Sequence, residues 1–461
     1  MFKGKRLGII VSGAYLAIAA STPAMAIDTL FDNFRPLPSS AMAGSFPESQ
    51  PFLLSSPNFS QVRIADRATQ VSLGQPNSGD WDMITANETG PSAGRYLFMP
   101  FETSTAGVQR IDLTTGQTRT IVQPGTQGFV SGDASRWAPW GGYLTAEESW
   151  GTGSTKGRLF EVTNPVSATG TGDSNFVQRT ILPRVSHEGL AFDKNNNLYF
   201  IDELNGGGIY KYHSANPNAT SGNDYFSAGQ TFAMQVAKGG NSNAVGSVTW
   251  APITNSTGGA LAGVSVLNPD GTIDGRATAD VVGGTHYQRP EDMEIKTLPN
   301  GDQIVFVTTT TTHEVYSINL ASNEVKVFAD RNTIDESTGH GGGASFITPD
   351  NLGIDAAGNI YIVEDNPTGD IWFARDVNND GVAESLGRWA SLSTRGAEPT
   401  GLYFDKFHAN VAYVNVQHPD SLADSTIMIS AIPEPKALSM LIAGLGLICA
   451  IVRRRPVTWT S

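Results

Sequence analysis

The sequence predicts an all-β protein, and three observations lead to that class. No helical periodicity of any length occurs between residues 60 and 430, where short β-rich runs alternate with Gly, Asn and Asp turns. Three-strand segments recur along the chain at irregular spacing. The 461 residues are 39% hydrophobic and only 16% charged, which supplies a large core and argues against a disordered chain.

The recurring segments narrow the class to a β-propeller. Residues 189–212 align without a gap onto residues 351–374, and each copy predicts strand, tight turn with an aspartate, strand, Gly-rich turn and strand. A looser third copy begins at residue 400. A β-sandwich would explain the strands but not the recurring frame. We therefore expect a single propeller with loop insertions, favour six blades over seven or eight, and expect a long loop or insertion at residues 213–245.

The first 26 residues read as a secretory signal peptide. Lys3, Lys5 and Arg6 precede an apolar run over residues 7–20, and Ala24-Met25-Ala26 fits the small-x-small cleavage pattern. A short membrane anchor is the alternative, but a polar and proline-containing stretch ends the run early. The folded domain is then expected at residues 27–431.

The C-terminal segment, residues 432–461, has the layout of a sorting signal. Pro433-Glu434-Pro435 precedes an apolar run over residues 437–452, which is followed by Arg453-Arg454-Arg455. Sixteen apolar residues are fewer than the roughly 20 that a spanning helix needs. This layout resembles the PEP-CTERM sorting signal, although a short tail anchor would also explain it. The resemblance implies processing by a membrane sorting protease, and we expect an exported protein of the cell envelope, outer surface or extracellular space.

Charge and cysteine content limit the partners and the chemistry. The formal net charge is −14, which argues against nucleic acid as a partner because a backbone binder needs a basic face. The single cysteine, Cys449, lies in the C-terminal apolar run, so the folded part has no thiolate ligand, disulfide or cysteine nucleophile. The sequence does not indicate an oligomeric state.

Four carboxylates occupy related positions in the repeats. Glu188 and Asp350 each lie five residues ahead of the turn aspartate of their copies, Glu398 precedes the third copy, and Glu291 opens a similar strand. Because the inner strands of a propeller start at one end of its channel, these side chains should converge there. Converging carboxylates repel unless cations neutralise them, and hard oxygen ligands beside Asn351 favour calcium. Solvated carboxylates at blade edges are the alternative.

Five short segments support a family resemblance. They are residues 186–189 (SHEG), 288–294 (QRPEDME), 349–352 (PDNL), 398–401 (EPTG) and 415–419 (NVQHP). In this order they resemble the successive signatures of PhoX-type alkaline phosphatases. The resemblance implies a propeller that hydrolyses phosphate esters with calcium and iron. It also implies that Glu188, Glu291, Asp350 and Glu398 are metal ligands, and that the forked guanidinium of Arg289 holds the phosphate.

One signature departs from the family pattern. Residues 140–148 (WGGYLTAEE) match it except that Ala146 stands where the family places an iron-binding cysteine. A methyl group cannot ligate a metal, so the departure leaves calcium as the expected cofactor and argues against iron. The adjacent Glu147 is a candidate ligand, with a surface carboxylate as the alternative.

These observations predict a metal-dependent phosphoester hydrolase that acts outside the cell on a phosphate ester or another small molecule. Cations would polarise the phosphoryl oxygens, Arg289 would hold the phosphate, and water would attack. A calcium-dependent propeller lactonase or esterase is a second reading, but a lactone needs no guanidinium. A non-catalytic, calcium-binding surface propeller is the third, and Ala146 is its main support. His187 and His418 are better explained as structural histidines than as proton carriers.

Overall fold

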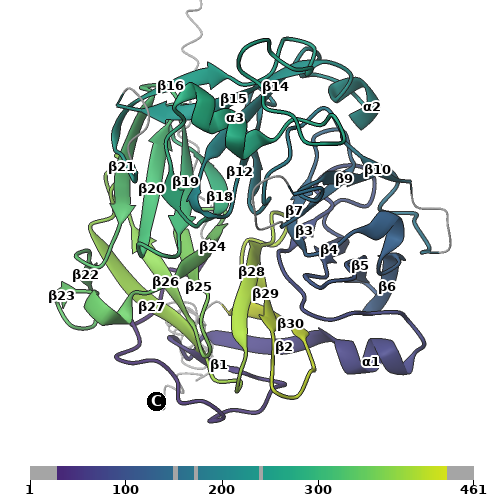
Figure 1. The fold of residues 1–461 in the computed structure, drawn as a ribbon. Helices are drawn as coiled ribbons and strands as arrows, with labels where there is room; N and C mark the ends of the chain where they lie inside the picture. The colour runs from purple at the N-terminus through teal and green to yellow at the C-terminus, as the bar shows by residue number, and fades with distance from the viewer. Residues whose placement is uncertain (1–28, 149–153, 171–174, 238–241, 433–461) are drawn as a thin grey trace, which may run out of the picture.

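The computed structural model describes residues 29–148, 154–170, 175–237 and 242–432 (Figure 1). The expected signal peptide and residues 433–461 of the expected sorting segment lie outside these residues. In the part of the chain that is described, no helix has the length and apolar character needed to cross a membrane.

The described structure is nearly all-β, with far more strand than helix, which confirms the all-β prediction. Its helices are short: α1 (Arg67–Ser72), η1 (Thr126–Gly128), α2 (Gly222–Tyr225), α3 (Gly275–Val282) and η2 (Gly343–Ser345). Four β-rich runs of the sequence form β4 (Tyr96–Pro100), β12 (Leu198–Ile201), β19 (Gln303–Thr309) and β25 (Ile360–Glu364). Their aromatic and β-branched residues suit a pleated, buried surface.

The strands pair as successive four-stranded antiparallel meanders. The first three contain β3 (Thr85–Ala86), β4, β5 (Val108–Asp112) and β6 (Gln117–Val122); β7 (Gly132–Trp137), β8 (Tyr143–Glu147), β9 (Leu159–Val162) and β10 (Phe176–Gln178); β11 (Leu190–Phe192), β12, β14 (Ile209–Ser214) and β15 (Gly229–Val236). The next three contain β18 (Pro290–Thr297), β19, β20 (Glu314–Asn319) and β21 (Glu324–Ala329); β24 (Pro349–Ile354), β25, β26 (Asp370–Arg375) and β27 (Ser385–Leu392); β28 (Glu398–Phe404), β29 (Val411–Gln417), β30 (Ser425–Ala431) and β2 (Phe59–Asp66).

The remaining strands extend or join these meanders. They are β1 (Phe52–Leu54), β13 (Asn205–Gly207), β16 (Gly246–Pro252), β17 (Tyr287–Gln288), β22 (Ile334–Asp335) and β23 (His340–Gly341). Strand β16 pairs with both β15 and β21, which makes two meanders one continuous sheet. The expectation of a loop over residues 213–245 is wrong for β15, because this strand completes its meander and pairs with β14. Its Gly- and Gln-rich start hid the strand from the sequence pattern.

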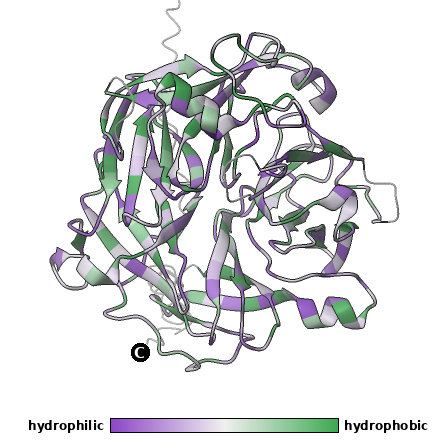
Figure 2. Ribbon diagram, viewed as in Figure 1, coloured by the Kyte–Doolittle hydropathy of each residue, from purple (hydrophilic) through white to green (hydrophobic). Residues whose placement is uncertain are grey.

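The sheets are arranged around a common centre (Figure 1). Among the described residues, six apolar clusters lie between successive meanders, and the last cluster joins β28 and β29 to the first meander through residues such as Trp81, Tyr403 and Tyr413. Figure 2 shows hydrophobic and hydrophilic residues interleaved along the strands, as expected where sheets are packed on their faces. The fold is therefore propeller-like.

The turn aspartates of the three sequence repeats take the same structural role. Asp193 and Asp355 each accept backbone N–H groups two and four residues later, and each accepts a tyrosine hydroxyl at 3.3 Å, from Tyr199 and Tyr361 respectively. Asp405 closes the third copy in a similar way. The repeats therefore share a turn geometry, which fixes where each of these strands ends and the next strand begins.

Residues near the start of the described chain complete the last meander. Strand β2 pairs with β30, so an early strand closes a sheet formed by the latest ones. Phe31 and Phe59 pack on Trp389 with ring centroids 5.6 and 5.5 Å away. Trp389 is fully buried in β27 and also contacts Tyr361 and Phe404. This aromatic cluster therefore joins the early segment to two sheets.

We expect Trp389→Ala to lower the free energy of unfolding by about 3–5 kcal/mol, because it removes a large side chain from a packed cluster. Urea denaturation followed by circular dichroism measures this loss. Val62→Ala on β2 is the control, since the Val62 side chain is 50% exposed. Equal, small losses in both variants would contradict the role given to the aromatic cluster.

Candidate functional site

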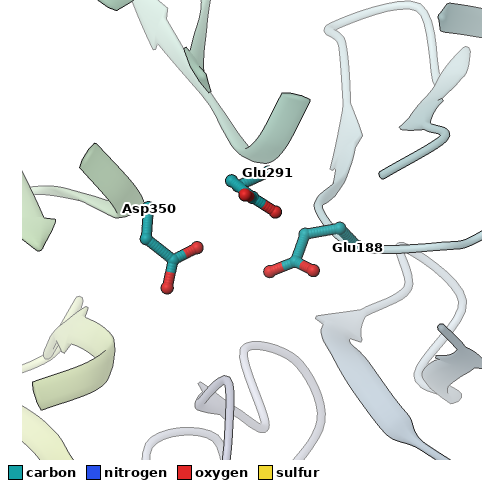
Figure 3. Close-up of side chains that lie close together, drawn as sticks. All are labelled: Glu188, Glu291 and Asp350. Atoms are coloured by element: carbon teal, nitrogen blue, oxygen red, sulfur yellow. The ribbon is translucent and has the colours of Figure 1, made fainter. Parts of the chain in front are cut away.

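Three carboxylates from three different meanders meet at the centre of the fold. Glu188 lies two residues before β11, and Glu291 and Asp350 are the second residues of β18 and β24. One oxygen from each lies within 4.8 Å of the other two (Figure 3). Glu188 and Glu291 are buried and Asp350 is partly buried. We call these three residues the central carboxylate cluster.

A break in strand register lies near the start of β18 and of β24. The pairing of β18 with β19 shifts between Pro290 and Met293, and the pairing of β24 with β25 shifts between Pro349 and Leu352. The residues inside these irregularities include the cluster members Glu291 and Asp350. A bulge redirects side chains out of the regular alternation, and here two of the three carboxylates lie in one.

Glu398 lies outside the central carboxylate cluster, contrary to the expected convergence of all four acids. In β18 and β24 the cluster residue directly follows a proline, whereas in β28 the residue after the corresponding Pro399 is Thr400. The Thr400 hydroxyl bonds to Asp82 Oδ1 and Asn351 Oδ1, at 2.6 Å each. Glu398 precedes the proline and lies 3.5 Å from His418 Nε2. Its position is therefore at the edge of the site.

Further acids that the sequence reasoning missed surround the cluster, and their charges act on one another and on it. With Glu398, we call them the surrounding acids: Asp82, Glu102, Asp133, Glu148, Glu203, Asp365 and Glu398. Asp133 lies on β7 inside another register break, between Gly132 and Ser135. Its Oδ1 is buried and receives no hydrogen bond from a described donor.

Three of the surrounding acids belong to pairs of adjacent acids. Each pair lies at the end of the second strand of a meander, namely β8, β12 or β25. In Asp202-Glu203 and Glu364-Asp365, the first acid is held by the fold: Arg276 Nε donates to Asp202 at 2.6 Å, and Trp372 Nε1 donates to Glu364 at 2.9 Å. The second acid of each pair faces the centre. These two pairs occupy equivalent positions in the aligned repeats. The sequence alignment of the repeats could therefore have identified Glu203 and Asp365 as acids of the site.

Glu147 is the first acid of a third such pair, and the structure does not bring it to the cluster. Both carboxylate oxygens accept from Arg158, with Nε to Oε2 at 2.7 Å, and the side chain is fully buried. Its neighbour Glu148 instead acts electrostatically on Glu102 and Glu203. Successive side chains point to opposite sides of a strand. The acid of this pair that lies toward the cluster is therefore Glu148, one residue after the predicted ligand Glu147.

Burial and mutual repulsion disfavour the charged forms of these carboxylates. Burial raises the pKa of Glu188 well above 4.5, and Asp133 adds to the rise. Burial also raises the pKa of Asp350, with further repulsion from Glu291 and Asp365. The pKa of Glu398 rises to about 9 through burial and the neighbouring Asp365. Positive charge at this site, from protons or from cations, would therefore be favourable.

Arg289 provides a positive charge at this centre. Its Nη2 lies 2.7 Å from Glu203 Oε1, and its Nε lies 3.1 Å from Glu291 Oε1. Burial alone would lower the pKa of Arg289, but Glu291 and Glu203 raise it above its usual value. Arg289 directly precedes Pro290, the first residue of β18, and has a φ of +53°, which is uncommon for a residue other than glycine. Backbone geometry therefore helps to hold the guanidinium beside the cluster.

The two histidines differ in their surroundings. The His187 ring is fully buried at 5.3 Å from the Phe200 ring, and burial lowers its pKa to about 3, so it is neutral. His418 lies 3.3 Å from Asp80 and has a raised pKa because of that carboxylate. Ala146 is fully buried in an apolar cluster with Leu159, and the described residues include no cysteine.

The fold and the site define a propeller-like protein with a carboxylate centre that could hold a metal ion. The profile of the alkaline phosphatase PhoX family matches residues 85–420, from the start of β3 to just after β29. The chain belongs to this family of phosphatase-like hydrolases, which is metal-dependent and whose members are typically exported. Among curated protein sequences, no relative matches the chain.

Several solved structures are similar to the chain at low identity. A candidate phosphatase from Bacteroides thetaiotaomicron has 12% identity over 77% of this chain and 72% of its own, with a TM-score of 0.44. A protein of unknown function from the same organism has 12% identity over 85% and 75%, with a TM-score of 0.40. Aldose sugar dehydrogenase from Streptomyces coelicolor, solved with PQQ bound, has 11% identity over 81% and 98%, with a TM-score of 0.39. These scores are too low to carry an argument.

The two acids that end β8 should respond differently to neutralisation. We expect Glu147→Gln to lower the free energy of unfolding by about 3–5 kcal/mol, because Arg158 keeps a buried charge without its partner. Glu148→Gln should leave stability unchanged or raise it, because it removes one of several repelling charges. Urea denaturation in the presence of a chelator makes the comparison. A loss in Glu148→Gln as large as that in Glu147→Gln would contradict the assignment.

Proposed function

We propose that this chain is a calcium-dependent phosphoester hydrolase that acts outside the cell. The observation that carries the proposal is the convergence of Glu188, Glu291 and Asp350 within 4.8 Å at the centre of a propeller-like fold. Membership of the PhoX family supports phosphoester hydrolysis as the activity. The charge distribution supports a cation, because carboxylates greatly outnumber basic groups at this centre.

The donor set fits a hard divalent cation. All three cluster ligands are carboxylates, and oxygen-only sites favour calcium over softer metals. The unpartnered Oδ1 of Asp133 adds a buried oxygen with spare capacity nearby. A bound cation would supply charge neutralisation at the phosphoryl group. Glu188, Glu291 and Asp350 are the proposed ligands; Glu398 is proposed only at the edge of the site, and Glu147 is not retained.

Arg289 is the proposed phosphate-holding residue. Its guanidinium lies at the same centre and is shared between Glu203 and Glu291. A phosphate oxygen would replace part of these carboxylate contacts with charge-assisted hydrogen bonds. The largely buried setting strengthens those bonds by excluding water from the site. Arg289 thereby orients the phosphate against the cluster and stabilises the charge that develops on it.

We also infer the arrangement of the chain around this site. Six meanders and six apolar clusters between them support a single six-bladed propeller within residues 27–431. The sequence of residues 1–26 supports export, and the sequence of residues 432–461, which a membrane sorting protease would process, supports a location at the cell surface. The typical export of family members also supports export of this chain.

Hydrolysis of p-nitrophenyl phosphate tests the proposed function. We expect turnover that a chelator removes and calcium restores, and a fall in kcat of about 100-fold or more in Arg289→Met because a transition-state donor is lost. Calcium at a hundredfold excess over its Kd should also stabilise the fold by about 2.7 kcal/mol. Asp350→Asn should weaken that stabilisation, whereas the control Asp380→Asn, an exposed aspartate, should not.

The two readouts separate the possible failures. Calcium stabilisation without hydrolysis would contradict the enzymatic part and favour a non-catalytic calcium-binding propeller. Hydrolysis without any calcium stabilisation would contradict the choice of metal. Hydrolysis of lactones or carboxylic esters, but not of phosphomonoesters, would favour the lactonase or esterase reading.

The substitution at position 146 gives a test of the metal content. We expect the purified protein to contain calcium and little or no iron, because losing a sulfur donor removes a specific bond to iron. Ala146→Cys should increase the bound iron, while Ala134→Cys, at a fully buried alanine of the same apolar cluster, should not. Elemental analysis measures both. Stoichiometric iron in the unmodified protein would show that carboxylates suffice and overturn the argument.

A further inference from the structure

The two histidines near the central carboxylate cluster have opposite environments. A structural role, which the sequence predicts for both, fits His187, because its ring is fully buried and neutral. His418 is different, since its side chain is 46% exposed. It directly follows Gln417, the last residue of β29, which pairs with Glu398 at the start of β28. His418 therefore lies at the end of the fold that carries the cluster, between the buried centre and the solvent.

Two carboxylates flank the His418 ring. Its Nδ1 lies 3.3 Å from Asp80 Oδ1, and its Nε2 lies 3.5 Å from Glu398 Oε1. Neither carboxylate is among the proposed metal ligands. Because the Asp80 carboxylate accepts the hydrogen on Nδ1, Nε2 is the nitrogen that remains for proton exchange with a ligand. A carboxylate in this position orients the imidazole of histidines that transfer protons in catalysis.

The Asp80–His418 pair joins the segment before β3 to the end of β29, and both members have an uncommon backbone conformation. Asp80 has a φ of +48° and His418 a φ of +57°. Such conformations in residues other than glycine cost free energy and cluster at functional sites. Glu102 connects the two segments, because its N–H donates to Asp80 O at 2.8 Å and its Oε2 accepts from Gln417 Nε2 at 2.7 Å. The Asp80 N–H also donates to Asp424 Oδ2 at 3.1 Å. The fold therefore fixes the orientation of the pair.

A series of neighbouring charged groups connects His418 with Arg289. Asp365 Oδ2 lies 3.8 Å from Arg289 Nη2. Burial raises the pKa of Glu398, and the neighbouring Asp365 adds to the rise. Glu398 in turn contacts His418. The side chains of Arg289 and Asp365 are 29% and 31% exposed, so together with His418 they mark the open side of the centre.

The open side is where an ester group would leave, and its departure needs a proton. An alkoxide is a strong base, so a positioned acid that protonates the leaving oxygen speeds the reaction. A histidine exchanges its proton near neutral pH, whereas an arginine keeps it. The hydrogen bond to Asp80 raises the pKa of His418 against the effect of burial, and the charges of Asp82 and Asp424 add to the rise. The surroundings of His418 thus favour the form that carries a proton on Nε2.

We propose that His418 donates the proton to the leaving group of the substrate and that Asp80 positions it. This assignment rests on the proposed phosphoester hydrolysis. With the phosphate held by Arg289, the ester oxygen lies on the open side and accepts from His418 Nε2. Water forms a new bond to phosphorus while the bond to the ester oxygen breaks, and the leaving oxygen takes the Nε2 proton and departs as an alcohol. The attacking water releases one proton to solvent, and His418 regains one from it.

A comparison of two substrates with the calcium-loaded, full-length protein tests the assignment. p-Nitrophenolate leaves readily without a proton, whereas the alkoxide of glycerol 2-phosphate does not. His418→Gln should therefore lower kcat for glycerol 2-phosphate by about 100-fold and lower kcat for p-nitrophenyl phosphate far less. The ratio of the two kcat values is the readout, because it does not depend on the fraction of the protein that is folded. Asp80→Asn should shift this ratio in the same direction.

His408 provides a matched control. It forms a second Asp–His pair, with Nδ1 3.1 Å from Asp405 Oδ2 at the opposite end of β28, so His408→Gln should leave the ratio unchanged. An unchanged ratio in His418→Gln would overturn the assignment while the proposed hydrolysis stands. A shift in Glu398→Gln without one in His418→Gln would give the role to Glu398 and also overturn it. Hydrolysis of neither substrate by the unmodified protein would overturn the proposed function and, with it, this assignment.

Discussion

The burial of several carboxylates at one point is the constraint on which the rest of this structure depends. Separate carboxylates in water would move apart, but these are fixed to different inner strands, which the apolar clusters between sheets hold in place. The register breaks at the starts of β18 and β24 then direct Glu291 and Asp350 toward Glu188. The packing of the sheets therefore supplies the free energy that opposes the repulsion, and the fold stores a site that attracts positive charge.

In each acidic pair, the first acid stabilises the fold and the second contributes charge to the site. Glu147, Asp202 and Glu364 are each saturated by hydrogen bonds that fix the end of a second strand. The residue that follows each of them projects to the opposite side and joins the surrounding acids. A buried, fully satisfied carboxylate positions its neighbour, so the same dipeptide serves stability and charge at once. Removing the first acid of a pair would disturb the second without any direct contact between them.

Much of the fold could be predicted from the sequence, because period, turns and repeats are local signals. Strand β15 escaped because its glycine and glutamine residues carry no strong strand pattern. The site was harder. Glu188, Glu291 and Asp350 could be predicted from their related places in the repeats. In β28 the position equivalent to Glu291 and Asp350 is Thr400, and Glu398, two residues earlier, was predicted in its place. Asp133 could not be found in this way because its own meander has no detectable repeat, and its place depends on how distant sheets pack.

The raised pKa values of the central carboxyl groups make both the stability of the fold and the binding of a cation depend on pH. A carboxylate whose folded pKa lies above its unfolded value holds protons more tightly in the folded chain, so its contribution to stability is present at low pH and is lost as pH rises. For Glu398 that loss extends from about 4.5 to about 9, and for Glu291 from about 4.5 to about 7. Across this window the metal-free fold carries growing repulsion. A cation removes the same repulsion and displaces the protons, so binding of cations strengthens as pH rises. The acids that make the empty site unfavourable at alkaline pH are the ones that make a bound cation favourable there.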